Sequence, residues 1–280
     1  MDGIILVNKP QGYTSHDVVN KLRKILGTKK VGHCGTLDPM ATGLLVVCVN
    51  KATKVLQFLT SEKKEYTATL TLGKHTDSYD QEGKVLKEEV VPALSEAKVK
   101  EVLDSFIGTY DQMPPIYSAI KVNGKKLYEY AREGKEVEIE PRRVTIEEIT
   151  FHSFENNEIT FSCICSKGTY IRSLCVDIAE RLGTIGYMSA LNRSHSGIFD
   201  LKDSSTLEEI EAGNYKLISL EEALASYDDY YVKDPKGIMS GKRLKSDKDG
   251  YVVIKTLDGK VLAMYEQTGE GMLKSVRGLW

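Results

Sequence analysis

The chain has 280 residues, of which 41% are hydrophobic and 28% charged; these proportions are typical of a folded globular protein and exclude a disordered one. No apolar run approaches the roughly 18 residues that a membrane helix needs, so we expect no membrane partner. The formal net charge is −2, which excludes a uniformly basic surface, but basic segments near both ends are compatible with an RNA partner.

The cysteines indicate free thiols in a reducing compartment. Their odd number, their wide spacing and the lack of a C-x-x-C pair argue against a disulfide framework and against a zinc site. The first residues carry no basic leader, and their apolar run is too short for a signal peptide. We therefore expect a cytoplasmic protein without a metal ion. The five cysteines are Cys34, Cys48, Cys163, Cys165 and Cys175.

The first quarter of the chain predicts alternating strands and helices. Residues 4–8 predict a strand, and Thr14 is a candidate N-cap for the helix that follows. A glycine-rich loop then precedes a buried strand at 44–49 and a short helix at 52–59. Residues 65–72 alternate, with Tyr66, Ala68, Leu70 and Leu72 on one face and threonines on the other. Alternation with a period of two predicts a strand with one buried face.

The middle of the chain predicts a helix, a basic insertion and a hairpin. Residues 95–106 have helical apolar spacing. Residues 116–140 carry lysines and tyrosines in alternation, which is typical of a surface that binds single-stranded nucleic acid but also of an ordinary amphipathic segment. Residues 144–154 and 159–165 predict two strands that turn at Asn156-Asn157.

The last part changes in composition. Thr169 is a candidate cap for a helix that runs to Leu182, and residues 185–200 and 206–226 predict a strand and an acidic helix. From residue 230 onward, short β-type runs lie among turns. The pattern predicts an α+β protein, with a mixed, mainly antiparallel central sheet and flanking helices over 1–229 and a small all-β domain over 230–280.

The most unusual segment runs from Gly32 to Gly43 and holds an Asp-Pro pair within a glycine-rich loop. Pro39 restricts Asp38 to an extended backbone, and a rigidly held carboxylate suits nucleophilic or acid–base chemistry. Composition alone favours a structural turn, in which Asp38 accepts backbone hydrogen bonds. No Gly-Lys-Ser/Thr follows, so a Walker A phosphate loop finds no support.

As a whole, this segment resembles the G-H-x-G-T/A-L-D-P-x-A-T-G signature of the TruB family of tRNA pseudouridine synthases. The chain departs from the family pattern at Cys34, which we interpret as a packing residue, and at Asn192, where an arginine is common and one basic RNA contact is therefore in doubt. The resemblance covers residues 3–200 and includes further motifs in the same order: K-P-Q-G at 9–12, K-E-Y at 64–66, G-x-x-T-D-x-x-D at 73–80, Y-S-A-x-K at 117–121, A-R-x-G at 131–134 and S-K-G-T-Y-I-R at 166–172.

The resemblance implies that Asp38 is the essential carboxylate. Arg172 would pair with Asp38, lower its pKa and orient its oxygens. Tyr66 would stack on the target uracil and help to remove the C5 proton. By residue type alone, a surface arginine and a core tyrosine are the commoner interpretations. Whether Asp38 adds to the ribose or base, or removes a ribose proton, stays open.

The resemblance also implies the groups that bind the RNA. Tyr170 and Leu191 would line the base pocket, and His33 would support the space that a flipped base leaves, because a stacked base must be extruded to be modified. For these three residues ordinary packing is the alternative. Phosphate contacts are implied for Lys9, Lys54 and Lys64, and for these lysines a solvated surface position is the alternative.

The implied fold is that of the pseudouridine synthases, with a thumb-like RNA-clamping insertion at about 116–140 and a PUA-like RNA-binding domain at 230–280. The implied reaction extrudes uridine-55 of the tRNA T-loop and isomerises it to pseudouridine. Because substrate and product are isomers, no cofactor is required. We expect the tRNA T-arm as partner, no obligatory protein partner and a monomer.

Three alternatives stay open. A tRNA-folding chaperone would bind RNA without catalysis, but the intact Asp38, Tyr66 and Arg172 argue against this. A guide-RNA-dependent, dyskerin-type subunit carries extra N-terminal sequence, whereas the first motif here begins at Gly3, which favours a stand-alone, bacterial-type enzyme. A glycosidase would need a second catalytic carboxylate or a metal, and no paired acidic motif stands out.

Overall fold

The computed structural model describes residues 1–60, 63–269 and 271–280. Its contacts group into two compact units. The first comprises Met1–Pro39, Gly43–Glu62 and Ser196–Trp280, and the second comprises Met40–Thr42 and Lys63–His195. Within the described ranges, no helix combines the length and the apolar character that crossing a membrane requires.

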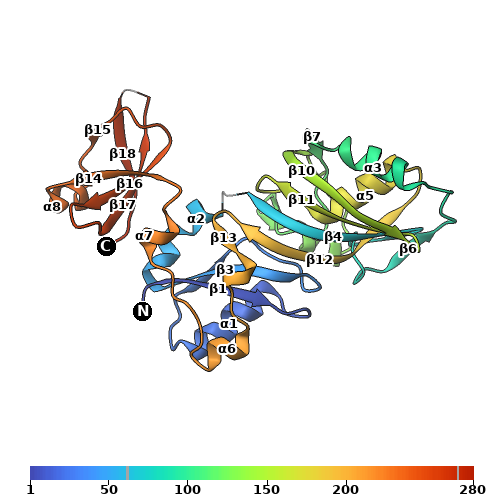
Figure 1. Cartoon of the computed structure of the whole chain (residues 1–280), viewed down its shortest axis with the longest axis horizontal. Helices are drawn as coiled ribbons and strands as arrows, with labels where there is room; N and C mark the ends of the chain where they lie inside the picture. Colours follow the sequence, from blue (N-terminus) through green and yellow to red (C-terminus); the bar gives the residue numbers. More distant parts are fainter. Residues whose placement is uncertain (61–62, 270) are drawn as a thin grey trace. The chain divides into compact units, whose positions relative to one another are not determined.

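The first unit begins with a small antiparallel sheet in which β3 (Thr42–Val49) pairs with β1 (Gly3–Lys9) (Figure 1). Strand β3 also pairs with β2 (Val31–Cys34). Helix α1 (Ser15–Ile25) packs Val18 and Leu22 into the same core as Ile5 and Val47 of this sheet. Thr14 caps α1 through a capping box, which confirms the predicted helix start. The chain therefore enters the loop at 35–41 from a strand that is fixed by pairing.

Two predicted helices of the first unit differ from expectation. The segment at 52–59 is a 3₁₀ helix, η1 (Asn50–Val55), followed by one turn of helix, α2 (Leu56–Leu59). The segment at 206–226 forms two short helices, α6 (Leu207–Glu211) and α7 (Leu220–Ala223). Each has its own capping box, and Gly213 between them has a positive φ of 83°, so the helical pattern is interrupted.

The first unit ends in a five-stranded sheet with the order β14-β16-β17-β18-β15. The β14–β16 pair is parallel and the other pairs are antiparallel. Its own core contains Val252, Ala263 and Leu273, with Ile238 of α8 against them. The all-β character predicted for the C-terminal region is confirmed, while the boundary at 229/230 stays a prediction. The elements are β14 (Asp228–Val232), α8 (Pro235–Met239), β15 (Leu244–Lys245), β16 (Tyr251–Thr256), β17 (Val261–Gln267) and β18 (Met272–Gly278).

The second unit contains a larger sheet with the order β12-β4-β11-β10-β7. Strands β4, β11, β10 and β7 pair antiparallel in succession. The turn between β10 and β11 has positive φ values at Asn156 and Asn157, which confirms the predicted hairpin. The strands are β4 (Lys64–Leu72), β7 (Gly108–Gln112), β10 (Arg142–Glu155), β11 (Glu158–Cys165) and β12 (Gly186–Ser196).

Helices α3 (Glu96–Asp104) and α5 (Ile171–Arg181) pack on this sheet and on each other (Figure 1). The prediction that Thr169 caps α5 is wrong. The N-cap residue is Tyr170, whose side chain makes no capping hydrogen bond, and the Thr169 hydroxyl donates to Ser166 O. The mixed, mainly antiparallel α+β architecture predicted from the sequence is confirmed. The short remaining elements are β5 (Lys74–Thr76), β6 (Val85–Glu88), β8 (Lys121–Val122), β9 (Lys125–Lys126), α4 (Leu127–Arg132), β13 (Phe199–Asp200) and η2 (Leu201–Asp203).

Candidate catalytic site

Asp38 lies in the half-buried loop between β2 and β3 of the first unit, and the residue before it is anchored to α1. The buried Ser15 hydroxyl accepts a hydrogen bond from Leu37 N at 2.8 Å and donates one to Leu37 O at 3.1 Å. Leu37 itself is buried. The first turn of α1 thus fixes the backbone on the N-terminal side of Asp38.

The residue after Asp38 is anchored from β1. Pro39 O accepts from Gly12 N at 2.8 Å and from the Lys9 ammonium at 3.2 Å. Lys9 is completely buried, and its ammonium also donates to Tyr13 O at 2.6 Å and Pro10 O at 3.0 Å. Lys9 is therefore not a solvated surface lysine, because carbonyl oxygens surround a buried ammonium that holds the Asp38 loop. Its phosphate role stays a prediction.

His33 and Cys34 lead into the same loop from β2. His33 is half-buried and lies opposite Val47 of β3. Cys34 is buried, and its Sγ lies 3.8 Å from that of Cys48. The contact with Cys34, together with burial, raises the pKa of the Cys48 thiol well above its usual value. The burial of Cys34 against Cys48 supports the interpretation of Cys34 as a packing residue.

Tyr66 occupies the buried face of β4 in the second unit, opposite Cys163 of β11. The fully buried Arg193 of β12 places its guanidinium 6.0 Å from the centre of the Tyr66 ring. Burial raises the pKa of the Tyr66 phenol, and the charge of Arg193 opposes this shift. Arg193 is a site neighbour to which the sequence reasoning gave no role, although it lies only two residues after the motif residue Leu191.

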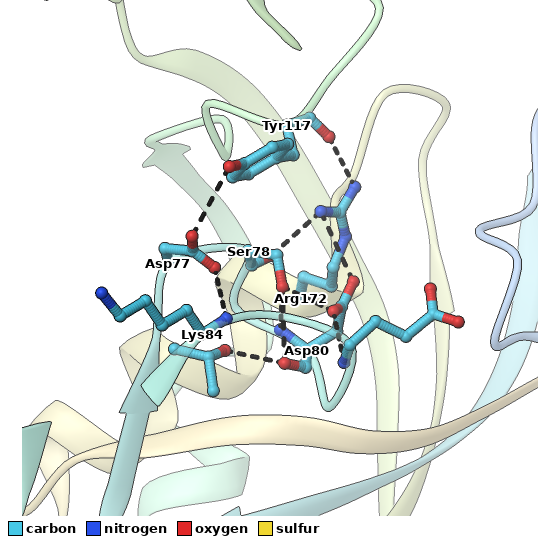
Figure 2. Close-up of polar contacts among 8 residues, drawn as sticks. Asp77, Ser78, Asp80, Lys84, Tyr117 and Arg172 are labelled. Carbon is cyan, nitrogen blue, oxygen red and sulfur yellow. Dashed lines mark hydrogen bonds and ion pairs between the residues drawn. The ribbon is translucent and has the colours of Figure 1, made fainter. Parts of the chain in front are cut away.

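Arg172 lies in the first turn of α5 and is buried, not on the surface. Its guanidinium donates to Ser78 O at 2.9 Å and to Tyr117 O at 2.9 Å, and one of its nitrogens lies 3.7 Å from Oδ2 of Asp80 (Figure 2). A cation at a helix N-terminus is opposed by the helix dipole, so these acceptors offset an unfavourable position. The pairing of Arg172 with Asp38 stays a prediction.

Asp80 is the carboxylate that sequence reasoning left without a role, although it closes the matched motif at 73–80. It is as buried as Arg172. Its Oδ1 accepts from the Ser78 hydroxyl at 2.6 Å and from Glu82 N at 3.1 Å (Figure 2). A Cβ atom at Gly83 would collide with the Ser78 hydroxyl, so the turn depends on glycine at this position. The turn therefore presents a rigid, buried negative charge to Arg172.

Tyr170 and Leu191 also lie in the second unit. Tyr170 is half-buried directly before α5. Leu191 is buried on β12, and its carbonyl accepts from the Thr42 hydroxyl at 3.5 Å. The same hydroxyl accepts from the Asn192 amide at 2.9 Å. Asn192, the departure from the family pattern, thus fixes the end of the signature segment instead of contacting solvent alone.

The other two lysines with an expected phosphate role differ from each other. Lys54 is half-buried and donates to the main-chain oxygen of Trp280 at 2.8 Å. Lys64 is largely buried on β4, where it lies opposite Cys165, and its charge is among the causes that lower the pKa of this thiol, after the contact with Cys163. Neither position is an ordinary solvated surface lysine, and the phosphate role of both stays a prediction.

The basic insertion forms the β8–β9 hairpin and helix α4. Cations lie over its tyrosine rings: Lys125 over Tyr130 at 4.9 Å, and Lys126 and Arg132 over Tyr128 at 5.2 and 5.3 Å. A cavity of about 480 Å³ lies beside the hairpin. Its lining includes Lys121, Asn123, Glu138, Glu140 and Arg142. The insertion thus presents charged and polar groups around a hollow.

No group of three or more His, Cys, Asp or Glu side chains suited to a metal ion occurs within residues 1–60, 63–269 and 271–280. The Asp80 carboxylate instead accepts from the Ser78 hydroxyl and from Glu82 N, and it lies beside Arg172. The arrangement offers a braced aspartate in one unit, and a buried tyrosine and a buried, ion-paired arginine in the other.

Models of protein families match most of the chain. The TruB family pseudouridylate synthase N-terminal domain matches residues 23–171, and the tRNA pseudouridylate synthase B C-terminal domain matches residues 172–229. By class the protein is an isomerase that forms pseudouridine. The chain belongs to the TruB family of pseudouridylate synthases.

Curated relatives agree over almost the whole length. The chain is 40% identical to tRNA pseudouridine synthase B of Mesoplasma florum, with 99% of this chain and 97% of the relative covered. It is 46% identical to that of Syntrophotalea carbinolica, covering 92% and 83%, and 43% identical to that of Bacillus cereus, covering 100% and 97%.

Solved structures show the same fold. A chain of a Cbf5–Nop10–Gar1 complex superposes with a TM-score of 0.78 at 25% identity, with 99% of this chain and 85% of that chain covered. A chain of an H/ACA ribonucleoprotein bound to a substrate RNA containing 2′-deoxyuridine gives 0.75 at 25% identity, with the same coverage.

Proposed function

We propose that the protein converts uridine-55 in the T-loop of tRNA to pseudouridine, with Asp38 as the catalytic carboxylate. The observation that supports this most directly is the bracing of Asp38 on both sides, by Ser15 at Leu37 and by Lys9 and Gly12 at Pro39. A carboxylate held in this way is preorganised for one reacting position. The relatives named tRNA pseudouridine synthase B supply the substrate class.

The proposed reaction leaves the composition of the nucleotide unchanged. The target uridine leaves its stack, the N1–C1′ bond breaks, the base turns, and a C5–C1′ bond forms. The C5 proton is then lost and N1 gains a proton, so atoms and electrons balance without a cofactor. Asp38 assists the cleavage, by addition or by removal of a ribose proton.

Tyr66 and Arg172 have distinct parts in this proposal. Because burial raises the pKa of Tyr66, its phenol stays protonated at neutral pH. We therefore assign it to stacking on the uracil rather than to proton removal as a phenolate. Arg172, held on Ser78 O, Tyr117 O and Asp80, supplies a fixed positive charge for the Asp38 carboxylate.

The remaining groups are assigned to RNA binding. Tyr170 and Leu191 line the base pocket, His33 supports the vacated stack, and Lys54 and Lys64 contact phosphates. The insertion at 116–140 clamps the T-arm as a thumb, and residues 230–280 act as a PUA-like RNA-binding domain. We further propose that the protein acts as a monomer in the cytoplasm without an obligatory protein partner.

The experiment that tests the proposal incubates the purified protein with an unmodified tRNA transcript and maps pseudouridine. We expect one modified site in the T-loop, without guide RNA or cofactor. Asp38→Asn should form none, and a transcript with cytidine at this site should stay unmodified. Equal modification by wild type and Asp38→Asn would contradict the proposed role of Asp38.

The same assay distinguishes a stand-alone enzyme from a guide-RNA-dependent subunit. The second alternative stays relevant because the fold is similar to chains of Cbf5 and H/ACA complexes. A dyskerin-type subunit would leave the free transcript unmodified until a guide RNA and partner proteins are added. A chaperone without catalysis would accelerate tRNA folding and form no pseudouridine. Site-specific modification by the protein alone excludes both.

A further inference from the structure

The side-chain amide of Gln112, the last residue of β7, holds the peptide of Tyr170. Its Oε1 accepts from Tyr170 N at 2.8 Å, and its Nε2 donates to Tyr170 O at 3.1 Å. Gln112 is 1% exposed. One buried side-chain amide of β7 thus binds both the backbone N–H and the backbone carbonyl of Tyr170, at the start of α5.

The orientation of this amide is fixed by a hydrogen-bonded chain. Gln112 Nε2 also donates to the hydroxyl of Tyr110 at 2.6 Å, and this hydroxyl donates to Oδ2 of Asp177 at 3.2 Å. A flipped amide would place its NH₂ group against Tyr170 N–H and its oxygen against the Tyr170 carbonyl. The Tyr110 hydroxyl favours the same direction, because it donates to Asp177 and so accepts from the Gln112 NH₂ group.

This contact holds the N-cap residue of a helix that has no side-chain cap. Tyr170 is the N-cap residue of α5, and its side chain makes no capping hydrogen bond. Gln112 accepts from the Tyr170 N–H, one of the amides at a helix start that have no partner within the helix. The adjacent segment adds one more tie, because the Ser173 hydroxyl donates to Met113 O at 2.7 Å. The start of α5 is therefore positioned by residues 112–113, and Arg172 lies in that first turn.

We propose that Gln112 is a positioning residue for the reaction: through the Tyr170 peptide it sets where the Tyr170 ring and the Arg172 guanidinium lie. Tyr110 and Asp177 act one step further away, by fixing the direction of the Gln112 amide. The inference rests on the proposed function, in which Tyr170 lines the base pocket and Arg172 orients the carboxylate.

Several titratable groups surround the hydrogen bonds that join Gln112, Tyr110 and Asp177, and they influence each other's pKa. Burial is the first cause that raises the pKa of Asp177, and the charge of Glu180 raises it further, while Tyr110 and Arg181 lower it. Burial and the charge of Asp177 raise the pKa of Tyr110, so the phenol is protonated over the whole usable range. Tyr79 and Cys175 also sense the charge of Asp177.

The test compares Gln112→Ala and Gln112→Glu with wild type by kcat and KM on a tRNA transcript. Because a small displacement of reacting groups costs up to about 100-fold in rate, we expect Gln112→Ala to lower kcat about 10- to 100-fold with little change in KM. In Gln112→Glu, the ionised carboxylate accepts from Tyr170 N but cannot donate to Tyr170 O, whereas the protonated carboxyl group can. The activity of Gln112→Glu relative to wild type should therefore rise as the pH falls from 8 to 6.

The matched control is Asp111→Asn, at the residue that precedes Gln112 on β7. This substitution removes an exposed ion pair with Arg143 and should leave kcat and KM unchanged. Thermal melts of all variants monitor folding. A lower melting temperature with wild-type kcat in Gln112→Ala, or a pH-independent ratio for Gln112→Glu, would overturn the positioning role. Absence of pseudouridine formation by wild type would instead refute the proposed function.

Discussion

Ser15 exchanges two hydrogen bonds with Leu37, one to the amide at 2.8 Å and one to the carbonyl at 3.1 Å. A side chain at the beginning of α1 thereby fixes the backbone that carries Asp38, the next residue. The hydroxyl of the capping residue of the same helix, Thr14, exchanges its hydrogen bonds with Asp17 of α1. Of the two neighbouring hydroxyls, that of Ser15 therefore positions the Asp38 loop and that of Thr14 stabilises the helix.

We expect Ser15→Ala to lower kcat by about tenfold or more, because a misplaced reacting group loses its favourable orientation. It should also cost about 1–3 kcal/mol of unfolding free energy, since buried backbone groups lose their partner. Thr14→Ala should cost about 1 kcal/mol of stability and leave kcat unchanged. Steady-state kinetics and urea melts check both. A similar fall in kcat for the two variants would contradict the role assigned to Ser15.

The burial of Lys9 predicts how Lys9→Met behaves in salt. When a protein loses one contact to an RNA phosphate, the dependence of log K on log salt concentration falls by roughly 0.7–0.9. Because the Lys9 ammonium binds three carbonyls, we expect this salt dependence to stay at the wild-type value while stability and kcat fall. Fluorescence titrations of tRNA at several salt concentrations measure the slope. A shallower slope would instead support a contact between Lys9 and an RNA phosphate.

The buried pair of Arg172 and Asp80 predicts a large effect of Asp80→Asn. Removal of one partner leaves a buried charge poorly compensated, which costs about 3 kcal/mol or more, and it frees Arg172 to shift, so kcat should fall as well. The control is Asp77→Asn in the same turn. Asp77 accepts from Lys84 N at 2.9 Å and from the Tyr117 hydroxyl at 3.5 Å. Denaturant melts and kinetics should show the smaller effect for Asp77→Asn.

The raised pKa of Asp177 predicts the sign of a pH effect on stability. Burial raises this pKa from 3.8 to about 6, so between these values the folded state binds more protons than the unfolded state. The contribution of Asp177 to stability therefore falls as pH rises through this window. The shift corresponds to at most about 3 kcal/mol at neutral pH, reduced by solvent screening because the carboxylate is only partly buried.

Asp177→Asn removes this charge and keeps an oxygen that accepts from Tyr110. The variant should gain stability relative to wild type at pH 7 and lose this advantage near pH 4. Urea melts at both pH values measure the difference. A variant that is less stable than wild type at pH 7 would show that the ionised carboxylate stabilises the fold.

The sequence predicted local features that depend on neighbouring residues. Asn156-Asn157 is sufficient for the hairpin turn, and Thr14 with Asp17 defines the start of α1. The helix expected over 206–226 was interrupted because Gly213 and a second capping box at Ser219 outweigh the apolar spacing. Periodicity alone does not weigh such stops against a continuous helix.

The site was less predictable, because its supports join distant residues. The burial of Lys9 at the end of β1 depends on Pro39, thirty positions away, and a lysine is ordinarily exposed. Asp80 and Arg193 lay within or beside matched motifs, yet only the fold brings Arg172 to Asp80 and Tyr66 to Arg193. Contacts between elements that are distant in the chain have no signal in the local sequence.

The side-chain amide that holds the N-cap residue of α5 comes from β7, 58 residues earlier in the chain. A short peptide covering α5 would therefore lack this contact, and isolated helices of this length are marginal in water. In native-state hydrogen exchange, the Tyr170 amide should open only when β7 separates from α5. Its protection should follow the unfolding of the whole second unit, instead of the fraying that is usual at a helix end.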